Sequence, residues 1–237
     1  MHSIHSSRHF VFVHGAWHDS TAWKTLRTHL DASTSTVELA SSGPDPARLG
    51  DLYSDAHLVR EHVRRLRTED PSRSITVVAH SYGGMPVSQG LFPEESERPL
   101  ADELIFVGAF MLNVGDSLRS VVGESIPDWW QVDKELDIVD PADPGPRFYN
   151  DLDQDAAARA IEALQHQRWS SFTLPLTQTA WRVIPSAYVI LERDQAIPPF
   201  VQEAMSSRAG RVHHLDTSHS PFLSAPDELA KVLLAGV

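Results

Sequence analysis

Residues Val77–Pro86 read VVAHSYGGMP, in which a β-branched pair leads through alanine and histidine to a serine and two glycines. One interpretation is a glycine-rich turn that only packs. The other is a turn that holds Ser81 in a strained, exposed position. Small residues two before and two after the serine, Ala79 and Gly83, let a strand and a helix approach closely and push the serine oxygen clear of a sheet. The stretch matches a G-x-S-x-G nucleophile elbow with alanine in the first small position, where size is the requirement.

A serine hydroxyl becomes a nucleophile only when a base takes its proton, and the base needs an acid that orients it. We expect the acid to be Asp194, which comes directly after a strand predicted to be buried, in AYVILERDQAIPP. A parallel sheet gathers the carboxyl ends of its strands at one edge, so Asp194 should project beside the elbow. Glu192 and Asp216 are rivals, but Glu192 is still on the strand and Asp216 lies too near the histidine's own loop.

For the base, the stretch HHLDTSHSPFLSAPDEL offers His213, His214 and His219. His213 and His214 fall within the last predicted strand, where a structural histidine is expected, whereas His219 lies on the loop that follows. The chain order Ser81, Asp194, His219 is the order expected of α/β-hydrolases and differs from the other common serine triads. Together the three residues predict covalent catalysis by the serine.

The reaction also needs donors for a developing oxyanion, and FVFVHGAW, which contains the first predicted strand, offers a place for one of them. We expect the backbone N–H groups of Ala16 and Tyr82 to point at this charge. The alternative for His14 and Gly15 is a tight turn without a catalytic role. His80, next to the serine, is expected to pack or to form local hydrogen bonds.

Short apolar runs alternate with helical patterns along most of the chain, which predicts an α/β fold with a mostly parallel central sheet and flanking helices. The predicted strands are Phe10–Val13, Val37–Leu39, Ile75–Ala79, Leu104–Ala109, Ala187–Leu191 and Arg211–Leu215. One helix face between the second and third of them is formed by Leu52, Ala56, Val59, Val63 and Leu66.

The alternation stops between residues 110 and 186, a stretch too long for one crossover and rich in proline and aromatic residues. We expect residues 1–109 and 187–237 to form the core domain and residues 110–186 to form an inserted helical lid, with a helix over residues 153–168. An ordinary second layer of core is the alternative. The side chains expected to line a mostly apolar substrate pocket are Trp17, Met111, Trp129, Trp130, Phe148 and Trp169.

The composition narrows the partners and the compartment. The 237 residues carry a formal net charge of −12, which argues against a nucleic-acid partner because phosphate binding needs clustered Lys and Arg. No apolar run is long enough to cross a bilayer, no secretory signal is visible and there is no cysteine, so a soluble cytoplasmic protein with no membrane partner is expected. The histidines of the amino-terminal HSIHSSRH could bind a metal, but a serine-rich terminal segment favours a mobile tail, and we assign no metal.

The chain resembles the α/β-hydrolase superfamily, and within it the group of plant methylesterases, hydroxynitrile lyases and small bacterial esterases. The segments that carry the resemblance follow the family order and span nearly the whole chain: HFVFVHGAWHDSTAWKTL, LASSGPD, VVAHSYGGM, YVILERDQAIPP and HSPFLSAPDEL. The resemblance implies no cofactor. It also implies a nucleophile, an acid, a base and two backbone oxyanion donors, which are in that order Ser81, Asp194, His219, Ala16 and Tyr82.

Two departures separate the branches of this group. Hydroxynitrile lyases carry a threonine where this chain has Gly15, and a lysine directly after the catalytic histidine, where this chain has Ser220. Cyanide elimination of that kind relies on the positive charge of the lysine. The hydrolase branch is therefore favoured.

The sequence predicts a serine hydrolase that cleaves a small, mostly apolar carboxylic ester or lactone through an acyl-enzyme. The same triad could serve a lyase, cyclase or acyl-transfer step in small-molecule biosynthesis, because fold and triad do not fix the reaction. A ligand receptor that has kept a hydrolase fold is a third interpretation. The sequence leaves open whether two copies form a homodimer.

Overall fold

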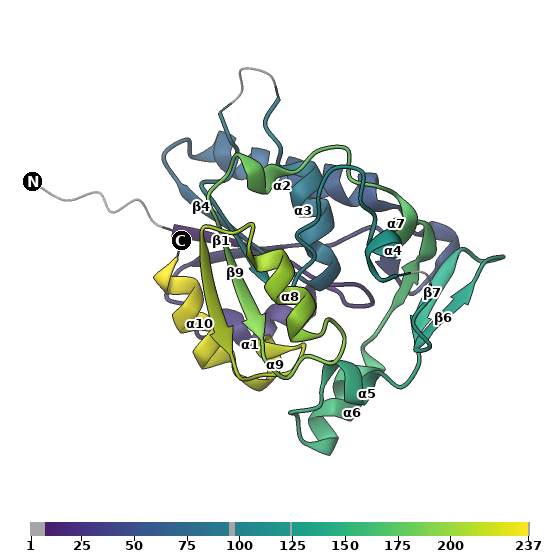
Figure 1. The fold of residues 1–237 in the computed structure, drawn as a ribbon. Helices are drawn as coiled ribbons and strands as arrows, with labels where there is room; N and C mark the ends of the chain where they lie inside the picture. Colours follow the sequence, from purple (N-terminus) through teal and green to yellow (C-terminus); the bar gives the residue numbers. More distant parts are fainter. Residues whose placement is uncertain (1–7, 95–97, 124, 237) are drawn as a thin grey trace, which may run out of the picture.

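The computed structural model describes residues 8–94, 98–123 and 125–236. His2 and His5 of the predicted amino-terminal tail lie outside the described residues. Within these residues a parallel sheet runs through the centre with helices packed against it, and an insertion projects to one side (Figure 1).

The central sheet has six parallel strands in the order β10-β9-β5-β4-β1-β2, which confirms the predicted parallel sheet. Its strands are β1 (Arg8–Val13), β2 (Ser33–Val37), β4 (Ser74–His80), β5 (Glu103–Val107), β9 (Ser186–Leu191) and β10 (Arg211–Leu215). The second strand ends at Val37, whereas the sequence predicts it at Val37–Leu39. As an edge strand paired with β1 alone, β2 stays partly exposed, so its sequence STSTV carries no apolar run that would reveal it.

Alternate side chains of the central strands enter two separate hydrophobic cores. On β1, Phe10 and Phe12 point into one core, and Val11 and Val13 point into the other. The first core is covered by α1 (Lys24–Arg27), α9 (Pro221–Ser224) and α10 (Pro226–Ala235), and the second by α2 (Leu52–Glu69), α3 (Gly84–Gly90) and α8 (Pro199–Ser206). The predicted apolar face of α2 is confirmed, since it is buried in the second core.

Between β5 and β9 the chain leaves the central sheet and builds the insertion, residues 110–185, since Ser186 already belongs to β9. It contains short helices, but it is not helical throughout, because three of its strands form an antiparallel sheet with a short strand of the core. The strands of this sheet are β3 (Ser42–Gly43) from the core and β6 (Trp130–Asp133), β7 (Ile138–Pro141) and β8 (His166–Arg168). The helices are α4 (Leu118–Val121), α5 (Pro144–Phe148), α6 (Gln154–Glu162) and α7 (Trp169–Thr173). Short 3-10 helices lie at Ser20–Trp23 (η1), Pro46–Arg48 (η2), Ser81–Gly83 (η3) and Ala180–Arg182 (η4).

The helix predicted over residues 153–168 is wrong in its last part, because α6 stops at Glu162 and β8 follows. Backbone pairing explains the change. Gln165 N–H donates to the Trp17 carbonyl oxygen at 2.7 Å, and Arg168 N–H donates to the Ser41 carbonyl oxygen at 2.8 Å. These partners are distant in sequence, so the helical periodicity of the segment could not reveal them.

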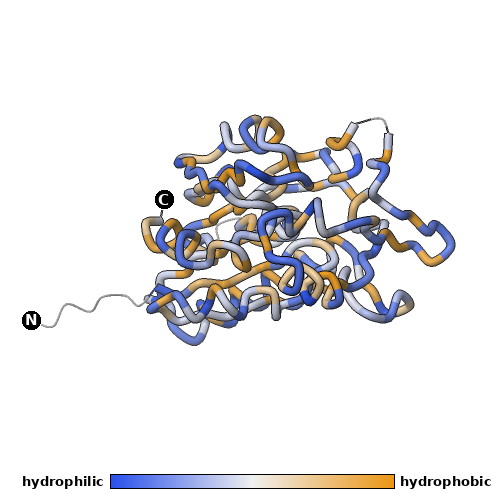
Figure 2. The backbone as a smooth tube through the Cα atoms, turned by 90° about the horizontal axis from the view of Figure 1, so that it is seen from below, coloured by the Kyte–Doolittle hydropathy of each residue, from blue (hydrophilic) through white to orange (hydrophobic). Residues whose placement is uncertain are grey.

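Hydrophobic and hydrophilic stretches alternate at short intervals along the backbone (Figure 2). Across the described residues, no helix combines the length and the apolar character needed to cross a membrane. The large apolar side chains instead gather in the two cores beside the central sheet.

Candidate active site

The serine elbow lies at the turn between β4 and α3. Ser81 has a backbone φ of +50°, a left-handed conformation that is uncommon for a residue with a side chain and is associated with strain at functional sites. Gly83 lies so close to the loop after β1 that a Cβ built on it would come within 2.6 Å of the His14 carbonyl oxygen. Packing therefore requires a residue without a side chain two positions after the serine, as an elbow does.

The structure brings the predicted acid and base into contact at the carboxyl ends of β9 and β10. His219 Nδ1 lies 2.7 Å from Asp194 Oδ2, and both side chains are almost fully buried. Asp194 Oδ2 also accepts a hydrogen bond from Gln202 Nε2 (2.9 Å), while Oδ1 accepts from the N–H groups of Ala196 (2.7 Å) and Ile197 (2.9 Å). An ionised carboxylate only accepts hydrogen bonds, so the imidazole carries its proton on Nδ1 and keeps Nε2 free to act as a base.

The two rival carboxylates lie elsewhere. Glu192 pairs with His214 at a solvent-exposed position, with an Oε1–Nδ1 distance of 2.5 Å. Asp216 is exposed and pairs with Arg193 at 3.0 Å. Neither carboxylate is hydrogen-bonded to His219 in the part of the chain that the structure describes.

Ser81 and His219 line the same cavity, which has a volume of about 450 Å³ and lies between the elbow and the insertion. No hydrogen bond of the described residues joins the Ser81 hydroxyl to His219. Such contacts are often long in unliganded sites and tighten in the reacting complex. The predicted pocket residues that line this cavity are Trp17, Trp129, Trp130 and Phe148.

Two predicted pocket residues, Met111 and Trp169, do not line the cavity. Met111 is fully buried in the core, next to Phe110, which does line the cavity. Trp169 packs against Trp130 and Phe172, with ring centroids 6.3 and 6.4 Å away, and these two rings face the cavity in its place. The prediction fails because a shift of one or a few residues along a loop or a short helix decides which side chain points inward.

Other lining residues escape the sequence reasoning altogether. They include Phe110, Arg147, Phe172, Ile197 and Phe200. Two of these residues could have been predicted from their positions in the sequence. Phe110 directly follows the predicted strand Leu104–Ala109, and Ile197 lies three residues after the predicted acid, Asp194.

The loop after β1 contacts the elbow directly. A Cβ built on Gly15 would lie 2.9 Å from Ser81 Cβ, so the loop can approach the serine this closely only without a side chain at that position. Ala16 and Tyr82, whose N–H groups are the predicted oxyanion donors, both line the cavity beside the serine. The next residue, Trp17, has a φ of +65°, which turns the chain sharply at this point.

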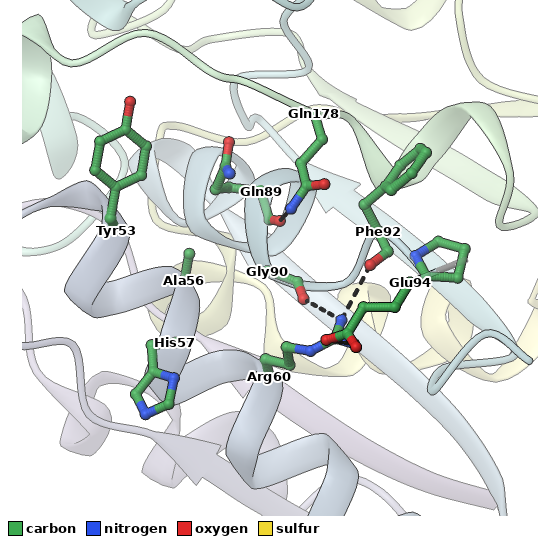
Figure 3. A pocket seen from close by; sticks show the side chains of 10 residues that line it. Tyr53, Ala56, His57, Arg60, Gln89, Gly90, Phe92, Glu94 and Gln178 are labelled. Carbon is green, nitrogen blue, oxygen red and sulfur yellow. Dashed lines mark hydrogen bonds and ion pairs between the residues drawn. The ribbon is translucent and has the colours of Figure 1, made fainter. Parts of the chain in front are cut away.

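A second cavity, of about 390 Å³, lies away from the elbow, with α2 on one side and α3 and the returning end of the insertion on the other (Figure 3). Its polar groups bond to one another: Gln178 Nε2 donates to the Gln89 carbonyl oxygen (3.1 Å), and Arg60 Nη1 donates to that of Phe92 (3.0 Å). The Gln89 side chain bonds to both the N–H and the hydroxyl of Thr177. The bonds of Gln89 to Thr177 and Gln178 attach the insertion to the core, and we assign no site to this cavity. In the described part of the chain, no group of three or more His, Cys, Asp or Glu side chains could hold a metal ion.

Buried histidines surround the elbow. Burial lowers the pKa of His18 to about 4 and holds the pKa of His80 well below its ordinary value of 6.5. Burial also lowers the pKa of His14. His80 Nε2 donates to the His219 carbonyl oxygen at 2.7 Å, so this neutral ring supports the loop that carries the candidate base.

We expect the free energy of unfolding to fall as the pH drops from about 7 to about 5. Below pH 6.5 the unfolded chain binds protons on these imidazoles, whereas the folded chain does not, so acid favours the unfolded state. The full shift of His18 corresponds to a loss of about 3 kcal/mol once the pH approaches 4. Asp55 acts in the opposite direction by a similar amount, because burial raises its pKa to about 6. Burial also lowers the pKa of His9 and His62, so these two histidines, together with His14 and His80, make the net effect of acid destabilising.

Urea unfolding followed by circular dichroism at several pH values measures this dependence. The variant His18→Gln is the control, because it removes one imidazole that must stay neutral and should flatten the slope. A free energy of unfolding that is unchanged or higher at acidic pH in the unmodified chain would contradict the prediction.

A parallel α/β sheet, a serine elbow after a central strand, and a buried carboxylate–histidine pair at the same edge define an α/β-fold serine hydrolase. The chain belongs to the alpha/beta hydrolase family, whose sequence model matches residues 10–232.

The chain is similar to proteins named as a methylesterase and as a synthase, and its fold is similar to that of a pyrethroid hydrolase. The chain is 25% identical to Methylesterase 2 of Arabidopsis thaliana, and the alignment covers 96% of this chain and 95% of that relative. It is 24% identical to Norfluorocurarine synthase 2 of a Strychnos species, with 96% and 94% covered. A crystal structure of a pyrethroid hydrolase from Sphingobium faniae JZ-2 superposes with a TM-score of 0.76 at 18% identity, covering 96% of each chain. The α/β-hydrolase fold predicted from the sequence is thereby confirmed.

Proposed function

We propose that the chain hydrolyses a small, mostly apolar carboxylic ester or lactone through an acyl-enzyme on Ser81. The observation that carries the proposal is the 2.7 Å contact between His219 Nδ1 and Asp194 Oδ2, with the imidazole and the strained serine on the wall of one cavity. The relative named a methylesterase supports ester chemistry.

In the proposed reaction, His219 Nε2 takes the proton of Ser81 Oγ while this oxygen attacks the carbonyl carbon of the ester. The N–H groups of Ala16 and Tyr82 stabilise the oxyanion that forms. The same proton then passes to the leaving oxygen, which departs as an alcohol. Water attacks the acyl-enzyme with His219 again as the base, which releases the carboxylic acid and restores the serine.

The walls of the cavity support an apolar substrate. The Trp17 ring lies 5.5 Å from the Phe148 ring and 5.6 Å from the Trp129 ring, centroid to centroid. The volume of about 450 Å³ lies within the range of small-molecule sites. Because the insertion supplies Trp129 and Phe148, we infer that it acts as a lid over the serine.

A second candidate is a lyase, cyclase or acyl-transfer enzyme that uses the same residues, and the relative named a norfluorocurarine synthase favours it. Cyanide elimination is disfavoured, because fully buried Ser220 stands where the lyase branch carries its lysine. Product analysis separates the remaining options. Hydrolysis of an ester yields an acid and an alcohol in equal amounts, and hydrolysis of a lactone yields one hydroxy acid, whereas the alternatives yield other products. A ligand receptor that has kept a hydrolase fold would show only incidental hydrolysis, without rapid multiple turnovers.

The proposal is tested by labelling with a fluorophosphonate probe and mapping the adduct by mass spectrometry, alongside hydrolysis of short-chain nitrophenyl esters. We expect a single adduct on the peptide that contains Ser81, and labelling that slows when an ester competes for the site. An adduct on another serine would refute the assignment of the nucleophile. Absence of both labelling and ester turnover would refute the hydrolase proposal.

A further inference from the structure

A fully buried carboxylate lies beneath the elbow, outside the proposed triad. Asp55 is on α2, three residues after Leu52 and four before Val59, and so faces the core instead of solvent. Its oxygens accept hydrogen bonds from the Ser41 N–H (2.9 Å), the Ser41 hydroxyl (2.5 Å) and the Tyr82 hydroxyl (2.8 Å). A buried carboxylate costs several kcal/mol in desolvation, and an apolar side chain would avoid that cost, so stability alone does not explain Asp55.

Two series of hydrogen bonds, called arms below, end at Asp55. The first arm connects Asp55 to Tyr82, one of the two proposed oxyanion donors. Tyr82 directly follows Ser81 and supplies one backbone N–H to the hole. Its side chain is fully buried in the core, and its hydroxyl donates a hydrogen bond to Asp55 Oδ2. The bond to the carboxylate therefore fixes the residue whose amide must face the oxyanion.

The second arm reaches the other donor through Gln167 of β8, which is fully buried. Gln167 Nε2 donates to Ser41 Oγ and to Ser171 Oγ, each at 2.8 Å. Gln167 Oε1 accepts the backbone N–H of Trp17 at 3.3 Å. Trp17 has a positive φ and comes directly after Ala16, so this bond holds the turn that presents the Ala16 amide.

The hydrogen bonds of both arms run in one direction. Trp17 N–H donates to Gln167, Gln167 donates to Ser41, and the hydroxyl of Ser41 donates to Asp55, as that of Tyr82 does. Because an ionised carboxylate has no proton to donate, it can terminate both arms. An asparagine at position 55 would place an amide N–H against one of these donors and reverse or break an arm.

We propose that Asp55 is a positioning residue for the oxyanion hole, which it aligns through Tyr82 on one side and through Ser41 and Gln167 on the other. This inference rests on the proposed hydrolase function. The carboxylate touches neither substrate nor the reacting atoms. It acts by keeping the two backbone N–H groups aimed at the position where the oxyanion forms. A small misalignment of these donors weakens binding of the transition state more than binding of the substrate.

The test uses the variants Asp55→Asn and Tyr82→Phe, with Tyr188→Phe as the matched control. Tyr188 is also fully buried, and its hydroxyl donates a single hydrogen bond, to the Ala109 carbonyl oxygen at 2.8 Å. The readouts are kcat, KM, the thermal midpoint, and inhibition by a trifluoromethyl ketone and by its methyl ketone parent. The trifluoromethyl ketone accepts Ser81 Oγ at its carbonyl carbon, the serine proton moves to His219, and the new oxyanion occupies the hole.

For Asp55→Asn and Tyr82→Phe we expect kcat to fall by about tenfold to 100-fold with KM nearly unchanged. Inhibition by the trifluoromethyl ketone should weaken by the same factor, and inhibition by the methyl ketone should not change. Tyr188→Phe should lower the thermal midpoint without lowering kcat. If Asp55→Asn does not fold, Tyr82→Phe alone decides the question.

Normal kcat and normal trifluoromethyl ketone affinity in the Asp55 and Tyr82 variants, with active wild-type protein, would overturn the positioning role and leave the hydrolase function intact. Wild-type protein that neither hydrolyses esters nor binds the trifluoromethyl ketone would overturn the hydrolase function and, with it, this inference.

Discussion

Ser81→Ala is expected to lower kcat for ester hydrolysis by about 10⁶-fold while the protein stays folded. The substitution removes the oxygen that would form the acyl-enzyme, and the amides and cavity that remain can only bind the substrate. Alanine fits the position, because it loses only the hydroxyl and carries the same backbone strain at φ +50°. Initial rates with a nitrophenyl ester measure the effect, and the thermal midpoint should stay close to that of the wild type.

Ser88→Ala is the matched control for this prediction. Ser88 lies on α3, is fully buried, and its hydroxyl has no hydrogen-bond partner among the described residues. Losing this hydroxyl should leave kcat unchanged. If Ser81→Ala keeps more than about 1% of the wild-type kcat, another nucleophile carries the reaction.

Local signals in the sequence predict most of this fold and the core of the candidate site. The central strands β4, β5 and β9 are short runs of apolar residues, and α2 repeats its apolar residues at helical spacing. The site follows from topology, because a parallel sheet places the residues after β4, β9 and β10 at one edge. Ser81, Asp194 and His219 could therefore be proposed together although they lie far apart in sequence.

The features that escape prediction depend on partners that are distant in sequence. The strand β8 forms because it pairs with β7 and β3, and nothing within residues 163–168 reveals those pairings. The same holds for polar residues on buried helix faces. Gln202 and Asp55 are polar residue types that usually lie on the surface. Their burial is explained only by hydrogen bonds to partners elsewhere in the chain, Asp194 and Tyr82 respectively. For Asp55 one signal was available, since it falls on the apolar face between Leu52 and Val59.

Asp194→Asn is expected to lower kcat by about 10⁴-fold, as the loss of a triad carboxylate does elsewhere. Asp194 Oδ2 accepts hydrogen bonds from His219 Nδ1 at 2.7 Å and from Gln202 Nε2 at 2.9 Å. An asparagine amide group at that position donates instead, which stabilises the imidazole tautomer with its proton on Nε2. That tautomer cannot take the proton of Ser81. The flipped rotamer of the asparagine amide is also unfavourable, because its NH2 group would then face the N–H donors of Ala196 and Ile197.

Glu192→Gln is the control that decides between Asp194 and Glu192, two of the three carboxylates considered from the sequence. Glu192 is exposed and paired with His214, so its variant should keep wild-type kcat. Because Asp194→Asn also weakens buried hydrogen bonds, its thermal midpoint should fall, and rates are to be compared well below that temperature. Full activity of the folded Asp194→Asn variant together with an inactive Glu192→Gln variant would move the acid to Glu192. Full activity of both variants would show that His219 needs neither Asp194 nor Glu192 as its acid. That result would contradict the proposed proton transfer.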